Sequence, residues 1–141
     1  MVRKMLCLLL MLAVLCPLAL TEGAEPVDPR VQPAIALSFD DGPSEYTQQV
    51  LDILAENDCR ATFFMVGTAM SNMPEMVKAV YDSGNEIGLH TWRHNNLTKM
   101  SDSAIERNLK ACQDFIEEQT GITARWLRPP YGAVGKGYPN V

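Results

Sequence analysis

The sequence predicts an α/β fold in which helices cover a parallel sheet. Short apolar runs of strand length alternate with segments whose apolar residues recur at helical spacing, which is typical of βαβ units. The chain has 141 residues, of which 47% are hydrophobic and 21% are charged, as in an ordinary globular protein. This composition excludes a disordered or fibrous chain, and the length indicates one domain, at roughly 150 residues per domain.

The first 23 residues are typical of a secretory signal peptide and are not expected to join the fold. Arg3 and Lys4 form a short basic start, and an apolar run over residues 5–20 precedes polar residues. The run is shorter than the ~20 residues that a membrane-spanning helix needs, and Pro17 interrupts it. We therefore expect a secreted or cell-envelope protein, with an uncleaved membrane anchor as the alternative. The Pro-rich, polar residues 24–33 are expected to form a linker.

Four strands and three helices are expected in the remaining chain. The predicted strands are 34–39, 61–66, 86–89 and 124–127, each a short apolar or β-rich run, and the first is expected to be buried. The predicted helices are 45–57, with Ser44 as its cap, one that starts at 72–75 and ends near Gly84, and one that opens at Ser101 and Asp102 and is stopped by Gly121.

Charge and cysteine content exclude two further classes of protein. The formal net charge is −5, which argues against a nucleic-acid partner because such proteins usually carry a basic patch. Two of the four cysteines, Cys59 and Cys112, lie outside the signal segment, and their spacing excludes a CxxC zinc site. In a secreted protein this pair could form a disulfide. The apolar pattern around each of them favours two buried free thiols instead.

Polar clusters follow three of the predicted strands. Asp40 and Asp41 come after the first, His90 and His94 after the third, and the segment 128–131 after the fourth. Because parallel strands end at one edge of a sheet, and sites in such folds lie there, we expect the clusters to meet.

The histidine pair indicates a metal site. His90 and His94 are four residues apart, so on one helical turn their side chains would face the same way. Together with an aspartate they would form a His-His-Asp set that leaves positions open for water and substrate. The two adjacent aspartates point in different directions, so one could bind the metal while the other, paired with Arg128, stays free as a base. The alternative to a metal site is that these residues have no joint function. The histidines and the arginine would then lie on the surface, and Asp-Asp-Gly-Pro would form an ordinary turn.

These clusters resemble the three motifs of the polysaccharide deacetylase family, which is defined by the NodB homology domain and is also called carbohydrate esterase family 4. The matching segments are Ser38-Phe39-Asp40-Asp41-Gly42, His90-Thr91-Trp92-Arg93-His94 and Arg128-Pro129-Pro130-Tyr131. They occur in the family's order, each after a predicted strand, and the resemblance covers roughly residues 34–132.

The resemblance implies a role for each matching residue. Asp40 is similar to the catalytic base, and Arg128 is similar to the arginine that holds that base. Asp41, His90 and His94 resemble the ligands of a divalent metal, usually zinc. Tyr131 is similar to the residue whose backbone N–H faces the oxyanion, and Thr91 and Pro130 resemble structural supports.

The family's fold is a distorted (β/α) barrel, here apparently truncated after about four βα units, so residues 34–141 would be the N-terminal part of such a domain. Two late family motifs do not occur in the sequence, among them the Leu-x-His motif whose histidine protonates the leaving amine.

The implied function is a metal-dependent hydrolase that removes N-acetyl groups from an extracellular or cell-wall polysaccharide, such as peptidoglycan or a chitin-like polymer. Its expected partner is this substrate, with no stable protein partner and no membrane contact beyond an uncleaved signal segment. Because the late histidine is missing, a non-catalytic fragment that binds metal or glycan is one alternative. An esterase that removes O-acetyl groups from xylan is another, since an alcohol leaves more easily than an amine.

Overall fold

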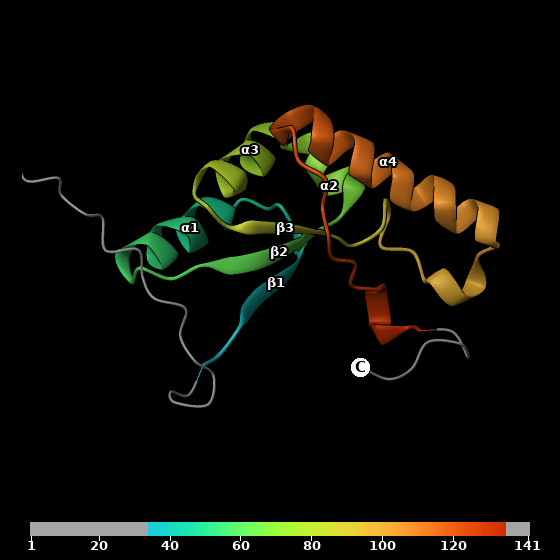
Figure 1. Ribbon diagram of the computed structural model, residues 1–141, viewed down its shortest axis with the longest axis horizontal. Coiled ribbons are helices and arrows are strands. Elements are labelled where there is room, and N and C mark those ends of the chain that lie inside the picture. The colour runs from blue at the N-terminus through green and yellow to red at the C-terminus, as the bar shows by residue number, and fades with distance from the viewer. Residues whose placement is uncertain (1–33, 135–141) are drawn as a thin grey trace, which may run out of the picture. The chain divides into compact units, whose positions relative to one another are not determined.

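The computed structural model describes residues 34–134 of the chain (Figure 1). The predicted signal peptide over 1–23 and linker over 24–33 lie outside the described residues. No helix within 34–134 has the length and apolar character needed to cross a membrane.

Strands and helices alternate along the described range, as the sequence predicts. In chain order the elements are β1 (Leu37–Gly42), α1 (Thr47–Glu56), β2 (Ala61–Met65), α2 (Gly67–Asn72), α3 (Pro74–Asp82), β3 (Glu86–Leu89), the short 3₁₀ helix η2 (Leu97–Lys99), α4 (Asp102–Thr120) and the 3₁₀ turn η3 (Pro130–Gly132). The predicted α/β class is therefore confirmed.

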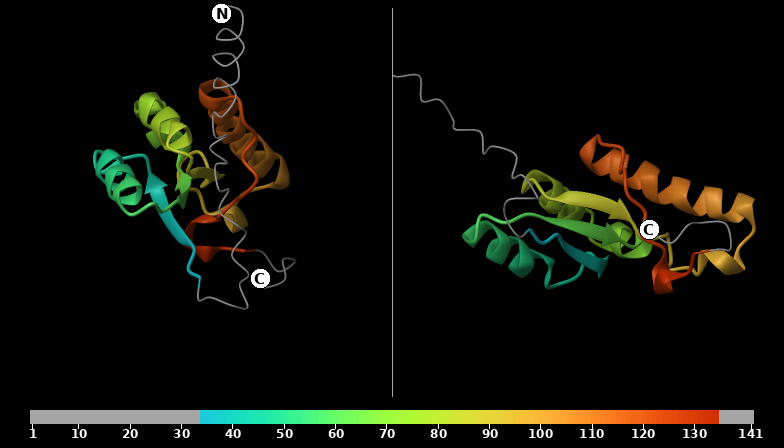
Figure 2. Two further views of the ribbon diagram at one scale, coloured as in Figure 1. Left: turned by 60° about the vertical axis from the view of Figure 1, so that its left-hand side comes forward. Right: turned by 60° about the horizontal axis from the view of Figure 1, so that its bottom comes forward.

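The three strands form a parallel sheet in the order β1-β2-β3. Ser38 and Asp40 on β1 lie opposite Thr62 and Phe64 on β2, and Phe64 lies opposite Gly88 on β3. The strand arrows point the same way, so their carboxyl ends reach one edge of the sheet (Figure 2). This edge is where the sequence places its polar clusters.

The predicted fourth strand over 124–127 is wrong as an extended strand. Only Leu127 pairs with the sheet, in a parallel bridge to Leu89 at the carboxyl end of β3. Leu89 N–H donates to the Trp126 carbonyl at 2.8 Å, and Arg128 N–H donates to the Leu89 carbonyl at 3.0 Å. The ladder cannot continue because the next two residues are prolines and have no amide hydrogen.

Within residues 34–134, the four α-helices pack on one face of the sheet (Figure 1). The core consists of apolar side chains from that face and from the four helices: Leu51, Leu54, Ala61, Phe63, Met65, Met70, Val77, Val80, Ile87, Cys112 and Ile116. Side chains alternate along a strand, so Ser38 and Asp40 point to the other face of the sheet, which the helices do not cover.

Two features of the helices differ from the predictions. Ser44 does not cap α1 with its side chain; the helix starts at Thr47, whose Oγ1 accepts a hydrogen bond from Ser44 N–H at 2.8 Å. Helix α2 was not predicted, because its six residues contain no apolar period. It is held in place because the N–H groups of Gly67 and Thr68 donate to the carbonyls of Thr91 and Trp92 at 3.0 and 2.9 Å.

Strand β1 is less buried than its apolar sequence predicts, and it begins three residues later. Leu37 and Phe39 are 38% and 37% exposed. The reason is its position: within 34–134, β1 pairs with a neighbour on one side only.

The two cysteines are free thiols with different environments. Cys112 on α4 is fully buried, whereas Cys59 is exposed in the turn after α1. The predicted burial is therefore confirmed for Cys112 and wrong for Cys59, whose turn carries it away from the core.

Iodoacetamide is expected to alkylate Cys59 in the native chain and to leave Cys112 unmodified. Burial raises the pKa of the Cys112 thiol from 9.0 to about 11, against a smaller opposing effect of a hydrogen bond with the Gly67 backbone. The nucleophilic thiolate is therefore scarce at mildly alkaline pH. The raised pKa also means that stability falls as the pH rises from about 9 toward 11, because the unfolded thiol loses its proton first. Peptide mass mapping before and after denaturation checks the labelling; equal labelling of both residues in the native chain would contradict the burial.

Candidate active site

The two adjacent aspartates have different partners because of a bulge in β1. The β1–β2 register passes from Asp40 opposite Phe64 directly to Gly42 opposite Met65, so Asp41 is the extra residue. Its φ of 69° lies in the left-handed region, a geometry that bends a strand and turns a side chain out of the regular alternation. Asp40 stays on the open sheet face, while Asp41 turns toward the histidines.

Asp40 forms an ion pair with Arg128. Arg128 Nη1 lies 2.6 Å from Asp40 Oδ1 and donates a second hydrogen bond to Ser38 Oγ at 3.0 Å. The guanidinium also stacks over the ring of Phe64, with Cζ 4.0 Å from the ring centroid. Three contacts thus hold the arginine against the sheet. The sequence assigned no role to Ser38 or Phe64, although Ser38 is two residues from Asp40 and therefore shares its face of the strand.

The prediction that His90 and His94 share one helical turn is wrong. Residues 90–94 form a bent loop in which Thr91 and His94 have φ values of 66° and 53°. A non-glycine residue in this left-handed region costs about 1–3 kcal/mol, so surrounding contacts must hold the loop. The loop still brings the imidazoles together, with ring centroids 5.0 Å apart.

Three side chains of this site can hold a metal ion. Asp41 Oδ1 lies 3.3 Å from His90 Nε2 and 3.1 Å from His94 Nε2, and the three candidate ligand atoms all lie within 4.8 Å of one another. His90 is 4% exposed and Asp41 is 67% exposed, so the set is anchored on one side and open on the other.

The other ring nitrogen of each histidine has a partner of its own, and for His90 that partner leaves Nε2 available for coordination. His90 Nδ1–H donates to the Arg128 carbonyl at 2.6 Å; since a carbonyl only accepts, the proton is on Nδ1 and a neutral ring has a free lone pair on Nε2. His94 Nδ1 lies 3.1 Å from the Tyr131 hydroxyl, and the two rings meet edge to face at 4.7 Å. Such outer contacts are typical of metal-binding histidines, so the donor set fits a divalent ion.

Arg128 therefore serves both halves of the site. Its side chain holds Asp40, and its backbone carbonyl orients His90. Tyr131, predicted to act through its backbone, also contacts His94 through its hydroxyl. The predicted supports Thr91 and Pro130 are both buried. The structure thus brings all eight predicted residues to the carboxyl ends of the strands; their roles stay predictions.

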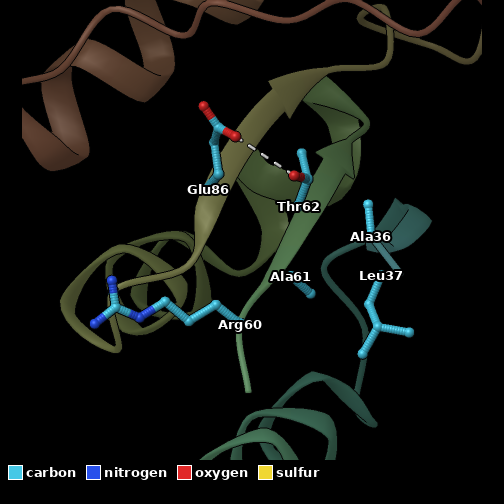
Figure 3. Close-up of a pocket in the computed structure, with 7 residues that line it drawn as sticks. Ala36, Leu37, Arg60, Ala61, Thr62 and Glu86 are labelled. Atoms are coloured by element: carbon cyan, nitrogen blue, oxygen red, sulfur yellow. Dashed lines mark hydrogen bonds between the residues drawn. The ribbon is translucent and has the colours of Figure 1, made fainter. Parts of the chain in front are cut away.

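A hollow of about 320 Å³ lies at the other end of the sheet, beside the amino ends of the strands (Figure 3). Its lining residues are Ala36, Leu37, Arg60, Ala61, Thr62, Gly84 and Glu86. Thr62 Oγ1 donates to Glu86 on the neighbouring strand at 3.5 Å, and Glu86 also accepts a hydrogen bond from Trp126 Nε1 at 2.7 Å. This hollow contains none of the predicted site residues.

Comparisons with known proteins agree with the motifs. A sequence model of the family described as polysaccharide deacetylase matches residues 28–141. Over 103 residues the chain is 42% identical to the peptidoglycan-N-acetylglucosamine deacetylase PgdA of Listeria monocytogenes, covering 72% of this chain and 22% of that protein. It is 40% identical over 98 residues to chitin deacetylase 1 of Cryptococcus neoformans, covering 70% of this chain and 21% of that protein.

The structural comparison gives the same result. The solved structure of the peptidoglycan deacetylase PdaC from Bacillus subtilis superposes with a TM-score of 0.74 at 40% identity, over 78% of this chain and 55% of that chain. The chain thus spans about half of that solved structure and about a fifth of the curated relatives. With the family model, this sequence identity and the shared fold in agreement, the chain belongs to the polysaccharide deacetylase family.

Proposed function

We propose that this chain carries the metal-binding and base-containing part of the active site of a hydrolase that removes N-acetyl groups from an extracellular or cell-wall polysaccharide. One observation carries the proposal: the bulge at Asp41 separates two adjacent carboxylates, so that Asp41 joins the histidines while Asp40 pairs with Arg128.

Asp41, His90 and His94 would hold the ion. Two imidazoles and one carboxylate suit zinc, and three protein ligands leave the open position that a catalytic site needs. When bound, a divalent ion supplies Lewis acidity, which polarises an amide carbonyl and makes water acidic enough to lose a proton near neutral pH.

Asp40 would accept the proton of the attacking water, because it lies beside the metal triad and is not a member of it. Arg128 would fix the direction of the Asp40 carboxylate through its short ion pair. The backbone N–H of Tyr131 would donate to the oxyanion, and one such donor contributes about 3–4 kcal/mol to transition-state stabilisation in other enzymes. Both histidines of the sequence belong to the proposed metal triad, so the departing amine would take its proton from water instead of from a histidine.

The substrate class follows from the relatives and from the proposed location. The names of similar proteins specify peptidoglycan and chitin deacetylases, whose substrates share N-acetylated sugar units. A secretory signal over 1–23 would bring this chain to such polymers outside the cell.

Acetate release from three polymers tests the proposal. With added Zn²⁺, we expect the chain to release acetate from peptidoglycan or N-acetylated chitooligomers and to lose this activity after chelation. Release from acetylated xylan alone would favour the esterase, because an ester needs less help in expelling its alcohol. Zinc binding without acetate release from any polymer would overturn the catalytic proposal and favour a metal- or glycan-binding role.

A further inference from the structure

We infer that Asn108, on helix α4, is a positioning residue that holds the histidine loop in its metal-binding conformation. The inference rests on the proposed metal site and adds a residue that lies outside the three sequence motifs. Asn108 is half-buried and contacts the loop over residues 91–95 through its side chain.

Asn108 contacts the loop through both ends of its side-chain amide. Its Oδ1 accepts a hydrogen bond from Trp92 N–H at 2.8 Å, and its Nδ2 donates to Asn95 Oδ1 at 2.9 Å. Because a backbone N–H only donates, the Trp92 contact settles which end of the amide is oxygen. The same Asn95 oxygen accepts from Arg93 N–H at 3.2 Å, so one asparagine on α4 organises two consecutive loop amides.

The loop needs side-chain support because its own backbone forms no regular structure. Thr91 and His94 both have positive φ, and residues 90–95 belong to no helix or strand. Helix α2 holds only the carbonyl side, through bonds from Gly67 and Thr68. The amide side depends on side chains, since Trp92 N–H is bound by Asn108 and Asn95 N–H by Thr91 Oγ1 at 2.7 Å.

The tightly packed Trp92 side chain limits how the loop can respond to the loss of its contact with Asn108. Its ring lies so close to Gly67 that a Cβ added there would be 2.2 Å from a ring atom, and it meets Phe115 edge to face at 6.3 Å. With the ring fixed, an unpaired Trp92 N–H can regain a partner within the protein only if the loop backbone turns. Such a turn would move His90 and His94, which flank Trp92 at two residues on either side.

The geometry also explains why the residue is an asparagine. The position needs an acceptor for Trp92 N–H and a donor for Asn95 Oδ1, and an uncharged amide offers both on one short side chain. Aspartate keeps the acceptor, but places a carboxylate against the Asn95 oxygen. Alanine removes both contacts.

Zinc affinity of the full 141-residue chain, measured by chelator competition, tests the inference. We expect Asn108→Ala to weaken zinc binding about 10–100-fold, the range typical of residues that orient metal ligands indirectly. Asn108→Asp is expected to lose less, because the Trp92 contact remains. The matched control is Gln113→Ala, which removes another half-buried amide from α4; within the described residues the Gln113 side-chain nitrogen has no hydrogen-bond partner.

Two further readouts separate positioning from stability. In the metal-free chain, Asn108→Ala should speed hydrogen exchange at Trp92 N–H, and the Co²⁺ absorption bands should change shape because the ligand geometry changes. Gln113→Ala should change neither, even if it lowers the melting temperature. Equal zinc affinity of the parent and Asn108→Ala would overturn the positioning role alone, as would an equal loss in the control. A parent chain that binds no zinc would overturn the proposed metal site and this inference with it.

Discussion

Replacing Asp40 with asparagine is expected to lower acetate release by a factor of about 10²–10⁴ while zinc still binds. Asparagine has nearly the same shape, and its oxygen can still accept the hydrogen bond that Arg128 donates at 2.6 Å. It cannot take a proton from water at neutral pH. Because Asp40 lies outside the triad of Asp41, His90 and His94, metal affinity should be unaffected. Acetate release under saturating zinc, together with chelator competition, measures the two effects separately.

Asp52→Asn is the matched control for this substitution. Asp52 is an exposed carboxylate on α1 that accepts a hydrogen bond from Gln48 at 2.8 Å. The control should keep the activity of the parent chain. Full activity of Asp40→Asn would show that another group is the base, whereas loss of zinc binding would show that Asp40 belongs to the metal site.

Replacing His94 with alanine is expected to abolish both zinc binding and activity. The substitution removes one of three candidate ligands, so the loss of affinity should exceed the 10–100-fold that changes in residues around the ligands typically cost. His94 is the better position to test because its side chain is 32% exposed, whereas His90 is 4% exposed and its removal would leave a gap in the core. Zinc titration and the melting temperature of the metal-free chain measure binding and stability independently.

Arg93→Ala serves as the control within the same loop. Arg93 precedes His94 and is exposed, and its backbone N–H donates to Asn95 Oδ1 at 3.2 Å, a contact that the substitution leaves in place. The control should bind zinc as the parent does. Zinc binding retained by His94→Ala would remove this histidine from the ligand set and leave Asp41 and His90 short of a third protein ligand.

Much of the site could be predicted because its polar residues directly follow apolar runs of strand length, and the chain direction shows which end of each strand they occupy. Asp40 and Asp41 at the end of β1, the histidines after β3 and Arg128 after Leu127 are far apart along the chain. Parallel strands bring their carboxyl ends to one edge, so the positions of these residues after apolar runs predict that they meet. The long helix α4 was predicted for a similar reason, since its apolar spacing and the left-handed Gly121 at its end are local signals.

The errors occur where geometry depends on distant contacts. The helical turn predicted for His90–His94 is a bent loop, because Asn108 and helix α2 bind its amides and carbonyls and so replace the internal hydrogen bonds of a helix. The predicted fourth strand is reduced to one bridge between Leu127 and Leu89, and the two prolines that follow prevent its extension beyond Arg128. Asn108 was missed because a single polar residue on an amphipathic helix looks like part of its solvated side.

The sequence by itself determined which chemical groups this site contains and at which edge of the sheet they gather, because residue type and strand direction are written along the chain. Only the tertiary structure decided which partner each group has there. The bulge at Asp41 assigns one carboxylate to the histidines and the other to Arg128, and the Arg128 carbonyl selects the ring nitrogen that His90 offers. The physical reason is that positive φ angles and hydrogen bonds between residues 38 and 88 positions apart are set by packing, which no local pattern encodes.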